Sequence, residues 1–249
     1  GGFGGPDWRC GVRYVGVTGF MSLAEVDAAL DALPPGLTLM CGVLASAKSL
    51  RGERNRWHRR YPAPEQIASI FSPEPRCLNL IHYCADEPPS AATVSRLQTL
   101  GGEECDGFQF NGAWPEPSTL AALAGAHVVL QLRPDGGAGD GDSAVRSLRN
   151  CDTHILIDGS GGNGVPISPD VCDAWGMAIR GHFGNDVGLG FAGGLDADYL
   201  PRLAAEVRSY GASIDAEGRL RDGDEGGVLN LDKVRAYLRA AGEVFGGAS

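Results

Sequence analysis

Asp158 has a residue type and a position that suit proton transfer. It ends the apolar run HILID and precedes a glycine-rich stretch. A carboxyl group at the end of a buried strand is partly shielded from water, which favours its protonated form and suits a proton donor. The structural alternative is an Asp whose oxygens accept hydrogen bonds from the N–H groups of the following glycines. We expect Asp158 to be a catalytic acid.

His82 is the candidate for the matching base. It lies near the end of the run LNLIHY, with Tyr83 and Cys84 directly after it. Side chains alternate along a strand, so only one of His82 and Tyr83 can face a common interior. The unperturbed imidazole titrates near neutrality, which suits a base. The alternatives are a His hydrogen-bonded beneath a loop and, for the chemistry, a reactive thiolate at Cys84.

A basic segment could hold an anionic substrate. Residues 48–60 (KSLRGERNRWHRR) carry six Lys and Arg residues against one Glu. Arg binds phosphate and carboxylate groups through two parallel hydrogen bonds, so Lys48, Arg59 and Arg60 are the expected substrate contacts. The alternative is a solvated loop that pairs with an otherwise acidic surface.

Four more residues complete the expected binding site. Gln109 and Asn111 are two residues apart on one strand and so share a face, where their amides could orient a polar ligand. Gly193 and Gly194 would let backbone N–H groups approach a phosphate, although a tight turn also uses glycine. No resident metal or cofactor is expected. Asp215 and Glu217 are the only visible carboxylate cluster that could serve catalysis or bind a divalent cation.

The elements that must position these residues alternate between two kinds. Short runs rich in Val, Ile and Leu indicate strands, and the segments between them have helical periodicity. Eight such units predict one α/β domain, a (β/α)8 TIM barrel over residues 11–249, with an open doubly wound sheet as the alternative. Residues 1–10 are expected to be a flexible lead-in, and 45–61 a long basic loop. The expected strands are 12–18, 37–43, 78–83, 106–110, 127–132, 153–157, 187–191 and 212–214, and the helices between them include 64–71, 142–149 and 196–210.

The amino-acid composition limits the classes of partner that the chain is expected to bind. The formal net charge of −10 disfavours nucleic acid and anionic membrane surfaces, and no apolar run approaches the length of a bilayer span. The seven cysteines are odd in number and never spaced as CxxC, which predicts reduced thiols in a cytoplasmic protein. A small anionic metabolite remains the expected partner. Trp114 belongs either to the rim of a pocket or to a contact between two copies in a homodimer.

Four segments in register resemble the phosphoribosylanthranilate isomerase family. Residues 106–112 (DGFQFNG) are similar to the family pattern DxVQLHG, with Asn111 where His usually stands. The run ILID with the later GGNG resembles the sixth-strand LLD and its GGTG loop. FAGGL at 191–195 is similar to LAGGL, and RRYPAPE at 59–65 resembles SxRYVSPE. The resemblance spans about residues 11–243 and implies a TIM barrel with Asp158 at the position of the family's general acid.

Two departures from the family concern the chemistry. The family opens with KxCGIT, whose Cys is its general base, and the matching segment here, RYVGVT, places Val15 at that position. A valine cannot move a proton. The family's Ser-Ser-Gly phosphate loop is replaced by Asp215-Ala216-Glu217-Gly218, which would repel phosphate unless Arg219 or Arg221 compensates. The resemblance therefore implies an isomerase or lyase on a small phosphorylated or carboxylated compound, or a non-catalytic metabolite-binding or regulatory barrel. A scaffold protein is the third reading.

Overall fold

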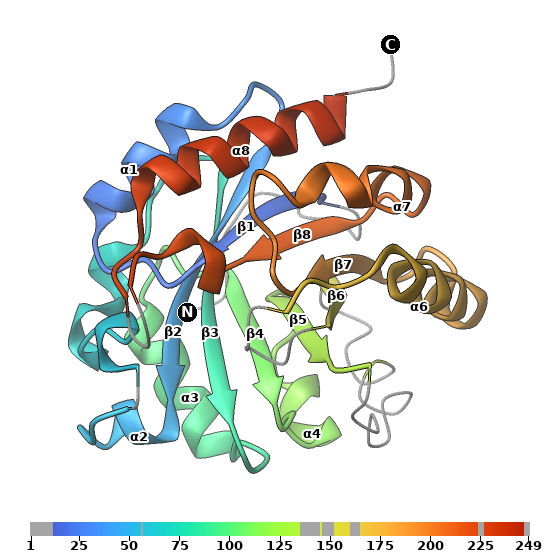
Figure 1. The fold of residues 1–249 in the computed structure, drawn as a ribbon. Helices are drawn as coiled ribbons and strands as arrows, with labels where there is room; N and C mark the ends of the chain where they lie inside the picture. Colours follow the sequence, from blue (N-terminus) through green and yellow to red (C-terminus); the bar gives the residue numbers. More distant parts are fainter. Residues whose placement is uncertain are drawn as a thin grey trace.

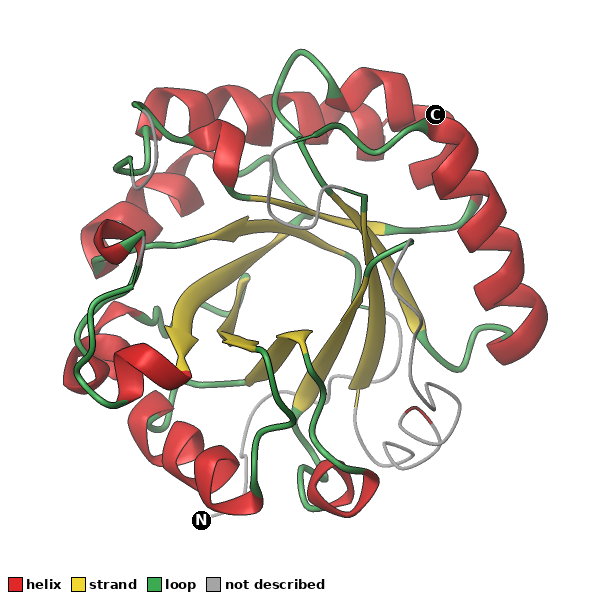
Figure 2. Cartoon of the chain, turned by 60° about the horizontal axis from the view of Figure 1, so that its bottom comes forward, coloured by secondary structure: helices red, strands yellow, loops and turns green. Residues whose placement is uncertain are grey.

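The described part of the chain is a closed barrel of eight parallel strands in sequential order, in a computed structural model. The structure describes residues 12–55, 57–134, 145, 152–159, 165–223 and 227–246. Figure 2 shows the ring of strands enclosed by helices. The TIM barrel expected from the sequence is confirmed, and the open sheet is excluded. The strands are β1 (Tyr14–Thr18), β2 (Thr38–Ser46), β3 (Cys77–Ala85), β4 (Gly107–Gly112), β5 (His127–Leu132), β6 (Asp152–Asp158), β7 (Gly188–Ala192) and β8 (Ser213–Ala216).

Helices follow the strands and cover the outside of the barrel (Figure 1). None of those in the described ranges combines the length and apolar character that a bilayer span requires. The α-helices are α1 (Leu23–Ala32), α2 (Ala47–Leu50), α3 (Ala91–Gly101), α4 (Pro117–Ala121), α6 (Pro169–Phe183), α7 (Ala204–Ser209) and α8 (Leu231–Gly246). The 3-10 helices are η1 (His58–Arg60), η2 (Pro64–Ile70), η3 (Leu200–Leu203) and η4 (Gly218–Leu220).

Local sequence explains where several helices begin. The side chains of Ser22, Ser90 and Ser168 each accept a hydrogen bond from the N–H three residues later, which caps α1, α3 and α6. At α1 the spacing of Ser22 and Glu25 suggests a capping box, but the Glu25 carboxylate accepts its hydrogen bond from the N–H of Met21, one residue before the cap, so only half of the box forms.

The structure differs from the expected elements in three places. Strand β2 continues through Ser46 and is followed at once by α2, so the expected loop over 45–61 is shorter and partly helical. The helix expected over 64–71 is the 3-10 helix η2, and the one expected over 196–210 is divided between η3 and α7. The helix expected over 142–149 lies outside the described residues, apart from Val145.

Each strand buries both of its faces, as parallel strands in a barrel do. One face packs against the helices in the main hydrophobic core. The other face points into the barrel, where a smaller apolar group lies that includes Leu80, Val129, Leu156 and Ala192. Alternation along the strands continues this inner face to polar side chains at the C-terminal ends, where barrels of this kind carry their active sites. The site therefore has to be sought inside this mouth.

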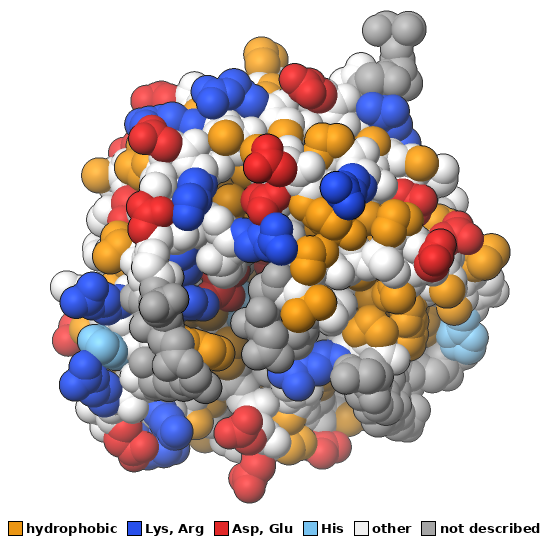
Figure 3. All heavy atoms as spheres, in the orientation of Figure 1, with side chains coloured by type: hydrophobic (Ala, Val, Ile, Leu, Met, Phe, Trp, Pro, Cys, Tyr) orange, Lys and Arg blue, Asp and Glu red, His pale blue; other side chains and the backbone are white. Residues whose placement is uncertain are grey.

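The surface is less uniformly acidic than the net charge suggests. Figure 3 shows one face of the molecule on which basic and acidic side chains lie next to one another. Local positive charge is therefore present on a chain with a net charge of −10.

Candidate active site

Two carboxyl groups lie inside the barrel mouth. Asp158 ends β6 and Asp215 lies in β8, and both are buried. In the strand register Asp158 pairs with Ala192 of β7, and Ala192 pairs with Asp215. On the inner face, the register position between the two carboxyl groups is therefore occupied by Ala192, whose side chain is a single methyl group. The acid expected at position 158 faces the interior, and a second one lies two strands away.

A chain of amides joins these carboxyl groups across the interior. Gln131 Nε2 donates to Asp158 Oδ2 at 2.7 Å, and Gln109 Nε2 donates to Gln131 Oε1 at 3.1 Å. Gln109 Nε2 also lies 3.2 Å from Asp215 Oδ2, and the Thr18 hydroxyl donates to Asp215 Oδ1 at 3.1 Å. Residues from five strands are thus held in one hydrogen-bonded network, which fixes the rotamers of both carboxyl groups.

Asp215 keeps its proton to unusually high pH. Burial raises the pKa of its carboxyl to about 7, even though the hydrogen bonds from Gln109 and Thr18 lower it, and the charges of Glu217 and Asp158 add to the rise. Gly16, its register partner on β1, leaves the space that the carboxyl occupies, since a Cβ there would lie 2.8 Å from Asp215 Oδ1. At neutral pH the mouth therefore contains a carboxyl group close to half protonation.

His82 faces the same interior from β3, while Tyr83 packs in the outer core. The imidazole is 3 % exposed, and neither ring nitrogen has a hydrogen-bond partner among the described residues. Burial lowers the pKa of His82, although the Glu217 and Asp158 charges oppose this. A neutral imidazole with an unengaged nitrogen can accept a proton.

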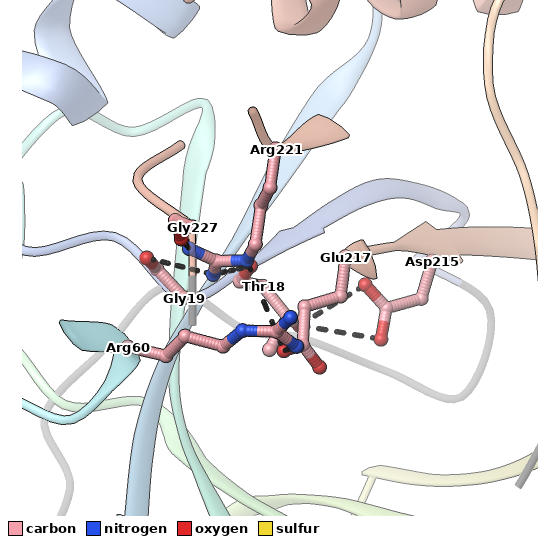
Figure 4. Close-up of polar contacts among 7 residues, drawn as sticks. All are labelled: Thr18, Gly19, Arg60, Asp215, Glu217, Arg221 and Gly227. Carbon is pink, nitrogen blue, oxygen red and sulfur yellow. Dashed lines mark hydrogen bonds and ion pairs between the residues drawn. The ribbon is translucent and has the colours of Figure 1, made fainter. Parts of the chain in front are cut away.

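Arg60 and Glu217 form an ion pair at the rim. Arg60 Nη1 donates to Glu217 Oε1 at 2.9 Å, and both side chains are partly buried (Figure 4). The guanidinium carbon lies 5.0 Å from the centre of the Trp57 ring. The Nε atom of Arg60 is buried and has no hydrogen-bond partner within the described ranges. The planar guanidinium therefore still has a donor available to an oxyanion.

Arg221 holds the backbone of the mouth together. Its Nη2 donates to the carbonyl oxygens of Thr18 and Gly19, at 3.2 and 3.1 Å, and its Nη1 to that of Gly227 at 3.1 Å. Figure 4 shows the guanidinium among these backbone segments. Burial lowers the pKa of Arg221 to about 10, so it stays charged at neutral pH. Gly19 has a φ of +95°, and a Cβ there would collide with Arg221.

We expect the substitution Arg221→Lys to destabilise the fold. The lysine ammonium lacks the planar, spread N–H groups of a guanidinium, so it cannot donate to all three carbonyl groups. The buried positive charge at position 221 would therefore lose most of its hydrogen-bond partners. The expected loss in the free energy of unfolding is about 3 kcal/mol. Urea denaturation measures it, with Arg219→Lys as the control, because Arg219 is half-exposed and pairs with Asp196 at 2.8 Å. Equal stability of the two variants would contradict this assignment.

Comparison with known proteins supports the fold. No family model matches the sequence, and no curated protein matches it either. Among solved structures, a phosphoribosylanthranilate isomerase in complex with reduced 1-(o-carboxyphenylamino)-1-deoxyribulose 5-phosphate is 12 % identical, with a TM-score of 0.60. The Pyrococcus furiosus isomerase is 17 % identical (TM-score 0.59), and that of Thermotoga maritima 14 % (TM-score 0.61). Each match covers 92 % of this chain and 98 % of the other.

The chain has the fold of the phosphoribosylanthranilate isomerases. Identities this low establish the architecture and leave the chemistry to be argued from the residues. The structure therefore has to be compared with the isomerase motifs one position at a time.

Neither Val15 nor Thr18 of β1 carries a proton-transfer group. Val15 packs in the outer core, so a side chain at this position faces away from the mouth. The inward residue at the end of β1 is Thr18, followed by Gly19, and the Thr18 hydroxyl donates to Asp215. Neither valine nor threonine is a general base. Cys84 does not supply a thiolate, since burial raises the pKa of its thiol to about 12.

Of the two glycine-rich loops that resemble the isomerase family, the structure describes the one at Gly193 and Gly194. Gly193 and Gly194 have φ angles of +109° and +59°, and the Gly193 carbonyl accepts a hydrogen bond from the Ile167 N–H at 3.1 Å. This is a turn that requires glycine. The loop at 161–164 lies outside the described residues. Arg219 and Arg221 are the two arginines that could compensate a phosphate. Arg219 forms an ion pair with Asp196, and Arg221 donates hydrogen bonds to backbone carbonyl groups.

The other expected substrate contacts make no described hydrogen bond or ion pair to the carboxyl groups of the mouth. Lys48 and Arg59 are exposed, and in the described part of the chain their side chains make no ion pair or hydrogen bond. Asn111 is half-buried beside Cys84 in the register and makes no side-chain hydrogen bond to a described residue. Trp114 lies at the rim, where its Nε1 donates to the Gln131 carbonyl at 3.1 Å. Of the three expected cations, only Arg60 contacts the mouth.

Sequence reasoning missed Gln131 and the structural role of Arg221. Gln131 is the single polar residue near the end of the apolar run HVVLQL, two residues after the inner Val129. That position is a usable signal, because it resembles the one that pointed to Asp158. Arg221 gave no such signal, since two of its three backbone partners, Thr18 and Gly19, lie more than 200 residues away in the chain.

Proposed function

We propose that this chain is an enzyme that catalyses acid/base chemistry, as an isomerase or lyase, on a small anionic metabolite. The observation that carries the proposal is the placement of Asp158, Asp215 and His82 inside one barrel mouth, with the carboxyl groups joined through Gln131 and Gln109. Burying three titratable groups together costs folding free energy, and such clusters concentrate at functional sites.

Each group is suited to a different task. His82 acts as the base, because its nitrogens have no described hydrogen-bond partner and burial lowers the pKa of its imidazole, which favours the neutral form. Asp158 acts as the acid that Gln131 orients. Both Asp215 oxygens are engaged by Thr18 and Gln109, which favours a positioning role. In its protonated form Asp215 also removes one negative charge from the mouth, which helps an anion to enter.

Arg60 is the proposed anchor for the anion. It has an unpartnered Nε, and Glu217 holds its guanidinium at the rim. One structure of the same fold was solved with a ligand that carries a phosphate and a carboxyl group, which supports a substrate of this charge. Lys48, Arg59, Asn111, Gly193 and Gly194 remain proposed contacts that substrate binding would have to bring into use.

Arg60→Gln is expected to weaken substrate binding about 10- to 100-fold, the effect of losing a charge-assisted hydrogen-bond pair. The readout is KM, or Kd for a ligand that is not turned over. Arg96→Gln is the control, because it removes the same charge from an exposed residue of α3 on the outer ring. Equal effects of the two variants would show that only the overall charge of the protein matters.

Mass spectrometry of metabolites that co-purify with the chain, followed by incubation with phosphoribosylanthranilate, tests the function. Conversion of a co-purified anion or of this compound supports the proposal. Saturable binding without conversion would instead indicate a non-catalytic metabolite-binding barrel, which the lack of a base at the end of β1 favours. Neither binding nor conversion of any anion would refute both.

A further inference from the structure

A second buried polar cluster lies at the opposite end of the barrel from the mouth. His127 begins β5, Asp152 begins β6, and His154 follows two residues later on the same inner face. His127 and Asp152 are register partners. The three residues are 2 %, 7 % and 2 % exposed. Further along the inner face Val129 and Leu156 separate them from the carboxyl groups of the mouth.

The hydrogen bonds of this cluster leave acceptors facing each other. The Val12 carbonyl accepts a hydrogen bond from the His154 ring, and we assign this bond to Nε2 because Nδ1 has no partner among the described residues. With this assignment the Nδ1 lone pair faces Asp152 Oδ1 at 3.9 Å, and that oxygen has no described hydrogen-bond partner either. Two buried acceptors without a proton between them repel each other, which a cation placed between them would reverse.

The other members add further unsatisfied groups. His127 Nδ1 lies 3.1 Å from Asp152 Oδ2, and His127 Nε2 has no partner in the part of the chain that the structure describes. The ring of Tyr14 contacts both imidazoles, and its hydroxyl likewise has no described partner. Native proteins leave few buried polar atoms unpaired, so several in one place point to a missing ligand.

We propose that His127, Asp152 and His154 bind one divalent transition metal ion, with Zn²⁺ the best match. One ligand atom from each residue lies within 4.8 Å of the others. Two ligand atoms about 2.1 Å from a zinc ion are roughly 3–4 Å apart, so small side-chain movements complete the site. Imidazole nitrogen and carboxylate oxygen are ligands that zinc accepts, and water would complete the coordination.

The surrounding chain supports this arrangement. Gly188 on β7 has no side chain, and a Cβ there would lie 2.2 Å from the His154 ring. The hydrogen bond from His154 to the Val12 carbonyl is the outer-shell contact that commonly fixes the tautomer of a metal-binding histidine. An ion here would join β5 to β6 at the end of the barrel that serves stability.

The test uses the full chain, stripped of metal with a chelator. Isothermal titration with Zn²⁺ is expected to show one ion per chain, with a rise in the melting temperature. Co²⁺ should give the visible absorption of a four- or five-coordinate site, displaced by Zn²⁺. No saturable binding, or binding without a change in melting temperature, would overturn the proposal.

Variants locate the ion. His154→Gln and Asp152→Asn should each weaken Zn²⁺ binding about 100-fold or more, a larger effect than the loss of an outer-shell contact. His58→Gln, at an exposed histidine, is the matched control and should bind as the wild type does. If the buried variants fail to fold, the wild-type chain with one equivalent of Co²⁺ still tests the proposal. A spectrum typical of octahedral, water-coordinated Co²⁺ would contradict a buried site. Equal loss in the control would also overturn the assignment.

Discussion

Replacing Asp158 with Asn is expected to reduce kcat/KM about 100- to 10,000-fold, the contribution of a positioned acid or base. The amide is close in size to the carboxyl and its oxygen can still accept the hydrogen bond from Gln131. The fold should therefore persist while proton transfer is lost. The measurement is turnover of whichever anion the wild type converts, with circular dichroism to verify the fold.

Asp31→Asn is the control for this prediction. Asp31 is exposed near the C-terminal end of α1, on the outer ring, so the same chemical change there should leave turnover unaltered. Unchanged kcat/KM in Asp158→Asn would refute the role of Asp158. A rise in KM with unchanged kcat would mean that the carboxyl binds substrate and does not transfer a proton.

The architecture could be predicted because parallel barrel strands bury both faces. Such strands appear in the sequence as short continuous apolar runs, for example 127–132 (HVVLQL), and their number matched a closed barrel. Alternation within a strand was equally informative. It required that only one of His82 and Tyr83 face inward, and the structure shows that this is His82.

The partners of these residues could not be predicted, since they depend on the register between strands. Six Lys and Arg residues in 48–60 look alike in sequence. Arg60 differs from Arg59 because the turn of η1 directs it to Glu217, 157 residues away. The cluster of His127 and Asp152 likewise depends on the pairing of β5 with β6, which no local pattern reports.

The pH dependence of stability should reveal Asp215. Its pKa rises from 3.8 to about 7 on folding, so the folded state binds this proton more tightly than the unfolded state does. The contribution of Asp215 to stability is therefore fully present below about pH 4 and is lost as the pH rises to 7 and above. A shift of this size corresponds to about 4 kcal/mol at pH 8.

Asp215→Asn should consequently make the protein more stable than the wild type at pH 8, by up to about 4 kcal/mol, with little difference at pH 4. An asparagine carries no charge to bury, and its oxygen can still accept from Thr18 or Gln109. Urea denaturation at pH 4, 6 and 8 measures the difference, and Asp27→Asn on the exposed face of α1 is the control. A difference that does not change with pH would show that Asp215 is ionised throughout. A gain confined to high pH would mean that the chain retains a costly carboxyl group in its mouth, as expected if Asp215 serves binding or catalysis there.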